Sequence, residues 1–180
     1  MEAGPAQVVA PHPAGFPSVV AAGSVVSLRL FVPGEPIPQA RPRGRVQGRG
    51  EKAWVQFYEP KANTEYKERV AETTRNQVLR TPVVEIGSGK DFLLPFVGVR
   101  ALITLRFNME RPKSYPSRIV DHTKRPDFDN LGKAVVDAIV DAGILKDDGC
   151  ITDATIQKRY ADDEHPEGVE IDLTVMPTEV

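Results

Sequence analysis

The segment from Lys124 to Asp148 constrains the fold of this chain more than any other stretch. Its middle part carries apolar residues at helical spacing on one face, namely Leu131, Val135, Ala138 and Ala142. Pro126 disfavours helix in the residue before it, and Gly143 is suited to follow the last helical residue. The sequence therefore predicts one amphipathic helix between Pro126 and Gly143, entered from an extended approach.

Several aspartates and one lysine accompany this predicted helix. Asp127 and Asp129 lie two residues apart at its start, and Asp147 and Asp148 follow its end. Lys133 lies one turn beyond Asp129 and can point toward whatever Asp129 binds. Mg²⁺ is usually held by one or two carboxylates together with water and substrate phosphate. Because such carboxylates repel one another without a cation, we interpret the segment as a metal site for cutting phosphodiesters.

Each of these features also has a purely structural explanation. A single Asp-x-Asp pattern often occurs by chance, and Asp129 is expected near the helix N-cap, a position that Asp favours. Lys133 can pair with Asp137, which is worth about a few tenths of a kcal/mol. Asp137 and Asp141 continue the row of Asp129 and Lys133 and are interpreted as helix-face residues. Asp147-Asp148-Gly149 is also typical of an ordinary turn.

Two basic segments flank the predicted helix in the sequence. Residues 35–52 carry Arg41, Arg43, Arg45, Arg49 and Lys52. The glycines and prolines of this segment predict a loop. Arginines on such a loop can bind phosphate through bidentate hydrogen bonds. A solvated flexible loop is the alternative. The second segment, residues 110–126, carries Arg111, Lys113, Arg118, Lys124 and Arg125 and leads directly to Asp127.

Aromatic and histidine side chains near these segments leave two interpretations open. Trp54, Phe57 and Tyr58 follow the first basic segment and either stack on exposed bases or anchor the loop to the core. His122 is predicted to lie at the surface, with a phosphate or metal contact as the alternative. His165 lies in a polar turn next to acidic residues.

The remaining elements predict an α+β domain. Strands are expected over residues 25–32, 97–109, 151–159 and 169–175, and a helix with a narrow apolar stripe is expected over residues 61–80. The strand 97–109 is apolar on both faces and should be interior. We predict a small mixed sheet flanked by two helices in a domain of residues 24–180, preceded by a flexible tail over residues 1–23.

Composition limits the class of protein. A chain of 180 residues fits one domain. The net charge of −2 argues against a globally basic nucleic-acid coat, although a local basic face is compatible with it. The single cysteine excludes an internal disulfide framework. The absence of a long apolar run or a signal-peptide pattern gives no reason to expect a membrane span, so a soluble, cytoplasmic protein is expected.

The run RPDFDNLGKAVVDAI, followed by LKDD and Lys158, resembles the RusA family of Holliday junction resolvases. The upstream run PGEPIPQARPR is similar to the first strand and basic loop of that family, so the resemblance covers residues 25–176. It implies that Asp127, Asp129 and Asp148 bind Mg²⁺ or Mn²⁺ and that Lys133 assists. The N-terminal tail and the loop around Gly87 depart from the family pattern.

The resemblance also implies an activity and its partners. The chain is expected to be a crossover junction endodeoxyribonuclease, a homodimer that resolves four-way DNA junctions by paired symmetric nicks in recombination and repair. Its expected DNA contacts are Arg41, Arg43, Arg45, Arg49, Lys124, Arg125 and Lys158. A non-catalytic branched-DNA-binding protein is the alternative. An Asp-x-Asp sugar transferase fits poorly without a nucleotide-binding βαβ pattern, and an EF-hand requires an oxygen ligand where Leu131 stands.

Overall fold

A computed structural model describes residues 19–22, 25–41, 43–50, 53–80, 94–96 and 98–177 of the chain. Its main sheet has the order β1-β2-β7-β5-β6. The bounds of these strands are Val19–Ala22 (β1), Val25–Pro33 (β2), Val99–Met109 (β5), Ile151–Tyr160 (β6) and Gly168–Pro177 (β7). β5 and β6 run parallel, whereas the other neighbours are antiparallel. The predicted mixed sheet is confirmed, and β5 is an interior strand as expected.

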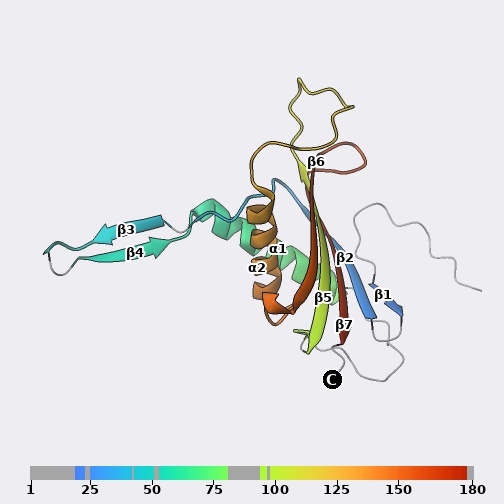
Figure 1. Cartoon of the computed structure of the whole chain (residues 1–180), viewed down its shortest axis with the longest axis horizontal. Coiled ribbons are helices and arrows are strands. Elements are labelled where there is room, and N and C mark those ends of the chain that lie inside the picture. Colours follow the sequence, from blue (N-terminus) through green and yellow to red (C-terminus); the bar gives the residue numbers. More distant parts are fainter. Residues whose placement is uncertain are drawn as a thin grey trace, which may run out of the picture.

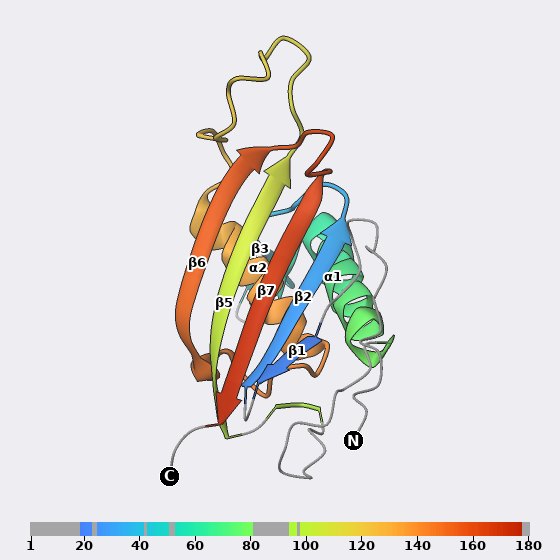
Figure 2. The same ribbon diagram turned by 90° about the vertical axis from the view of Figure 1, so that its right-hand side faces the viewer.

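Both helices cover the same face of this sheet (Figures 1 and 2). They are α1, Lys61–Arg80, and α2, Phe128–Asp141, and α2 lies on the connection between the parallel strands β5 and β6. The largest fully buried side chains of the core include Tyr66, Leu105, Phe107, Leu131, Ile139, Ile171 and Leu173. The helix predicted over residues 61–80 has these bounds, and the predicted apolar face of α2 is buried.

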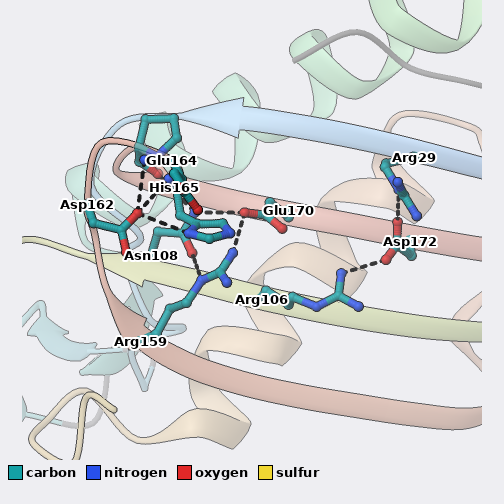
Figure 3. Close-up of polar contacts among 10 residues, drawn as sticks. Arg29, Arg106, Asn108, Arg159, Asp162, Glu164, His165, Glu170 and Asp172 are labelled. Carbon is teal, nitrogen blue, oxygen red and sulfur yellow. Dashed lines mark hydrogen bonds and ion pairs between the residues drawn. The ribbon is translucent and has the colours of Figure 1, made fainter. Parts of the chain in front are cut away.

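The opposite face of the sheet is polar. Asp172 on β7 accepts hydrogen bonds from Arg29 at 2.9 Å and from Arg106 at 2.6 Å, as Figure 3 shows. Partial burial opposes ionisation of Asp172, but these two arginines lower the pKa of its carboxyl below the usual value. Arg159 joins Asn108 and Glu170 further along the same face. The sheet therefore has one buried and one hydrated face, the usual pattern for antiparallel pairs.

A two-stranded hairpin projects from the body of the domain (Figure 1). It consists of β3, Arg43–Gln47, paired antiparallel with β4, Trp54–Tyr58. The prediction of a loop over residues 35–52 is therefore wrong for residues 43–47, which form strand β3. Trp54 and Phe57 are 56% and 69% exposed, so of the two alternatives left open for these rings, anchoring to the core is wrong.

The start of the chain also differs from the prediction. Residues 19–22 pair with β2, so the flexible tail predicted over residues 1–23 is wrong for this segment, and residues 1–18 and 23–24 lie outside the described residues. Most of the loop around Gly87, residues 81–93, also lies outside them. None of the helices in the described ranges is long and apolar enough to cross a membrane.

Candidate active site

Asp127 and Asp129 lie at the N-terminus of α2. Asp127 is the N-cap residue, with φ −70° and ψ 141°, and its backbone carbonyl accepts a hydrogen bond from the Leu131 amide. Asp129 lies in the first turn, two residues after the N-cap, so it is near the cap as expected. The Asp127 side chain makes no capping hydrogen bond, and both aspartates are exposed. Their carboxylates are thus available to a ligand.

An open hollow of about 630 Å³ adjoins Asp127. Its walls are Arg125, Pro126, Asn130, Met109 and the segment from Glu35 to Gln39. The Gln39 amide donates a hydrogen bond of 2.8 Å to the Asn130 carbonyl, which ties this segment to the first turn of α2. The hollow therefore places a cation, Arg125, beside an exposed carboxylate.

Lys158 on β6 binds the backbone of the segment that leads to Asp127. Its ammonium donates to the carbonyl of Lys124 at 2.6 Å and to that of Pro126 at 2.7 Å. An ammonium with two such acceptors fixes the backbone immediately before Asp127. These contacts give Lys158 a structural role, and its predicted contact with DNA stays a prediction.

The basic connection between β5 and α2 is folded against the end of the sheet. Arg111 donates to the Ala161 carbonyl at 3.1 Å, and its guanidinium lies 5.4 Å from the centre of the Tyr160 ring. Tyr115 packs edge-on against Tyr160, and the Lys124 ammonium lies 4.6 Å from the Tyr115 ring centre. Contact with Tyr115 raises the pKa of Lys124. Arg111 is therefore a structural residue, whereas Lys124 is exposed and within reach of a ligand.

His122 is buried, so the prediction of a surface histidine is wrong. It is 9% exposed, packs edge-on against Tyr160, and its amide donates to the Lys158 carbonyl. Burial, followed by the charge of Lys158, lowers the pKa of the His122 imidazole. His165, by contrast, pairs with Asp162 within its own turn, at 3.0 Å (Figure 3).

Asp148 lies beyond the other end of α2. It begins the 3₁₀ turn η2, Asp148–Cys150, and lines a hollow of about 280 Å³ with Asp137, Asp141 and Asp147. Lys67 of α1 enters the same hollow. Its ammonium lies 3.5 Å from Asp137 Oδ2 and 3.2 Å from Glu59 Oε1. This acidic group therefore already has an internal cation.

The length of α2 separates the two groups of aspartates. A helix of 14 residues is about 21 Å long, and Asp127 and Asp148 flank its opposite ends. Among the described residues no group of three or more His, Cys, Asp or Glu side chains could hold a metal ion. One chain does not bring Asp148 to Asp127 and Asp129. The exposed pair by itself offers the one or two carboxylates that Mg²⁺ commonly takes from a protein.

Lys133 turns toward the C-terminal end of α2 rather than toward Asp129. Its ammonium lies 3.4 Å from Asp137 Oδ1, and its side chain is 59% exposed. The ion pair between Lys133 and Asp137, which the sequence offered as the alternative role of Lys133, is therefore present. Such a pair is worth about a few tenths of a kcal/mol, so a phosphate could readily compete for Lys133.

The predicted basic contacts of the hairpin are partly described. Arg41, Arg45 and Arg49 are exposed, while the side chain of Arg43 and all of Lys52 lie outside the described residues. Sequence reasoning missed Gln39 and Lys67. Lys67 adjoins Asn63, Tyr66 and Val70 of the buried α1 stripe, and this position could have indicated its partial burial.

Comparison with known families matches this chain to the family described as endodeoxyribonuclease RusA, over residues 33–174. The matched range contains both helices, the hairpin and every candidate site residue from Arg41 to Lys158. A comparison with curated proteins finds no match.

Proposed function

The chain belongs to the RusA family of endodeoxyribonucleases, and from this premise we propose that it is a divalent-metal-dependent enzyme that resolves four-way DNA junctions. The observation that carries the proposal is the exposed pair Asp127 and Asp129 at the start of α2. Asp127 of this pair lines an open hollow that has Arg125 on its wall. Resolution of such junctions would serve DNA recombination and repair.

The two aspartates at the start of α2 fit a hard divalent cation. Carboxylate oxygens are its preferred protein ligands, and neither carboxylate is needed to cap the helix. When bound there, Mg²⁺ or Mn²⁺ would activate water and neutralise charge on the scissile phosphate. Arg125 and Lys124 would bind the flanking phosphates, because exposed cations beside acidic ligands offset their repulsion of DNA.

We further propose that a second copy of the chain contributes Asp148. In a two-fold dimer the same surface of each protomer faces the other, so two α2 helices crossing the axis would run antiparallel. The start of one helix would then lie near the end of its partner. This arrangement would form two equivalent sites, each from Asp127 and Asp129 of one protomer and Asp148 of the other, and would permit two symmetric nicks.

Lys133 would act on the phosphate from its position one turn beyond Asp129. Its weak pair with Asp137 would exchange for contact with the phosphate or the leaving oxygen. Once Lys133 contacts these oxygens, its positive charge would stabilise the negative charge that develops there in the transition state.

The proposal is tested with a synthetic four-way junction, labelled on each strand in turn. With Mg²⁺ or Mn²⁺ we expect nicks at symmetric positions on two opposite strands, and none with EDTA. A linear duplex of the same sequence is the control substrate. Tight junction binding without nicks in either metal would instead establish a branched-DNA-binding protein.

A further inference from the structure

The β3–β4 hairpin has two chemically different faces. Directly opposed residues of an antiparallel pair point to the same side. The register pairs Trp54 with Gln47 and Gln56 with Arg45, and these four residues, together with Tyr58, make up what we call the arginine–aromatic face. The side chains of Gln47 and Gln56 are hydrogen-bonded across this face.

The other face is apolar. Val55 and Phe57 lie over Gly44, where an added Cβ would come within 2.9 Å of Val55 and 3.4 Å of Phe57. Since every β4 side chain is exposed, both faces of the hairpin lack a covering layer in the described chain. The three aromatic rings are therefore divided between two surfaces. Trp54 and Tyr58 share the arginine–aromatic face with Arg45, whereas Phe57 lies on the apolar face.

The charge of the hairpin segment is opposite to that of the whole chain. Residues 41–58 contain five basic residues and one acidic residue, whereas the chain as a whole carries a net charge of −2. Arg41, Arg45 and Arg49 are exposed. A local positive potential of this kind attracts a polyanion.

The base of the hairpin is fixed beside the candidate active site. Gln39, just before the hairpin, donates its backbone amide to the carbonyl of Asn130, the residue after Asp129. The Gln39 side chain also donates to Glu59 Oε1 at 3.1 Å, and Glu59 directly follows β4. The hairpin therefore projects from the N-terminal end of α2, where a bound phosphate would lie.

We propose that the arginine–aromatic face of the hairpin is a stacking platform for unpaired bases next to the cut. This inference rests on the proposed function and adds the surface that would recognise the branch point. Trp54 and Tyr58 offer flat rings to bases, and Arg45 offers a planar cation to bases or phosphates. At an opened branch point the bases lose stacking neighbours that they keep within a duplex, so this face would favour junctions over linear DNA.

Trp54 is the only tryptophan of the chain, so its fluorescence reports on this face alone. The intact protein is titrated with a four-way junction, with Ca²⁺ replacing Mg²⁺ so that binding is measured apart from cutting. We expect quenching of Trp54 emission and reduced access of acrylamide to the ring, both stronger with the junction than with a linear duplex. Unchanged emission at saturation, with binding confirmed by anisotropy of labelled DNA, would overturn the platform but leave the nuclease proposal intact.

Matched variants then separate the two faces. Trp54→Ala should weaken junction binding by about fivefold or more, the loss expected for one base–aromatic stack, and Trp54→Phe should restore most of it. Phe57→Ala, on the apolar face of the same strand, should leave affinity within about twofold. An equal loss in Phe57→Ala, or conversion of a dimer to monomers by Trp54→Ala in sedimentation, would overturn the proposal and assign the hairpin to contact between protein chains.

Discussion

The two ends of α2 carry the same residue type in opposite electrostatic settings. At the N-terminal end Asp127 and Asp129 are exposed, and Asp127 shares a hollow with Arg125. At the C-terminal end Asp137, Asp141, Asp147 and Asp148 share a hollow with Lys67, whose side chain is only 16% exposed. The C-terminal group is partly neutralised within the chain, whereas the N-terminal pair has no comparable partner in the described residues. The comparison teaches that clustering alone does not identify a metal site, because an internal cation can neutralise part of the cluster, as Lys67 does at Asp137.

The largest expected effect is at the N-terminal end of α2. Asp127→Asn should lower the rate of junction cleavage on the order of 10³-fold, since bound metal supplies several kcal/mol of transition-state stabilisation. Junction binding should remain within about twofold. Cleavage is measured under single-turnover conditions with Asp153→Asn, an exposed strand residue on β6, as the control. Full cleavage by Asp127→Asn would remove this end from the active site.

The second prediction asks whether the two ends meet across a dimer. Asp127→Asn and Asp148→Asn should each be inactive, but a mixture that exchanges subunits should regain nicking. Each mixed dimer would hold one site with both native aspartates, so roughly a quarter of all sites should recover. Nicking is followed on a labelled junction after co-refolding of the two variants. A mixture as inactive as its components would contradict a site shared between protomers.

The third prediction concerns Lys158. Lys158→Met removes the donor to the Lys124 and Pro126 carbonyls and should lower the cleavage rate by about tenfold, because small displacements of a catalytic group are costly. Junction affinity and its salt dependence should not change. The slope of the logarithm of the binding constant against the logarithm of the salt concentration is measured by anisotropy of labelled DNA. Lys158→Arg is the conservative variant. A slope reduced by about one would instead identify Lys158 as a phosphate contact.

The fourth prediction tests the internal cation at the C-terminal end. Lys67→Met should lower the free energy of unfolding by about 1 kcal/mol, because Asp137 and Glu59 each lose an ion pair with Lys67. Added Mg²⁺ should restore more stability to this variant than to the native chain. Lys61→Met, which removes an exposed pair with Glu65, is the control and should change little. Thermal unfolding with and without Mg²⁺ decides, and equal stability of Lys67→Met and the native chain would refute the neutralising role.

The smallest expected effect is that of His122 on the stability of the fold at low pH. Burial lowers the pKa of His122 below its ordinary value near 6.5, so the folded state favours the neutral ring. This contribution to stability is complete above the ordinary value and is lost as pH falls through it toward the lower folded value. His122→Phe should therefore show a weaker decline in its urea midpoint between pH 7.5 and pH 5.5 than the native chain. Identical declines would show that other groups control the acid sensitivity.

Local patterns predicted much of the fold. The 61–80 helix has the expected bounds, and Gly143, with φ +69°, follows the C-cap of α2 as its position indicated. The hairpin was missed because β3 is rich in arginine and glycine and carries no alternating apolar residues that would indicate a strand. The burial of His122 and the carbonyl contacts of Lys158 depend on packing between the β5–α2 connection and β6. Such pairings across the chain leave no periodic signal.

The candidate site was also predicted only in part, because local patterns indicate neighbours in the sequence but not contacts between distant segments. Asp127 and Asp129 are close in sequence and lie together at one helix end, whereas Asp148 is close in sequence but separated by the helix itself. The helix length was already implied by the pattern between Pro126 and Gly143, so this separation could have been anticipated. The second protomer that we propose has no such signal, because no repeat or motif in one chain specifies where it would lie.

The length of α2 has a consequence for the geometry of cutting. Fourteen helical residues form a stiff rod of about 21 Å, and its length does not depend on loop conformation. If each site combines opposite ends of two such rods, the gap between the two cuts is fixed by the number of helical turns. The chain would then measure its substrate, accepting junctions whose two scissile phosphates match that span and rejecting those that do not.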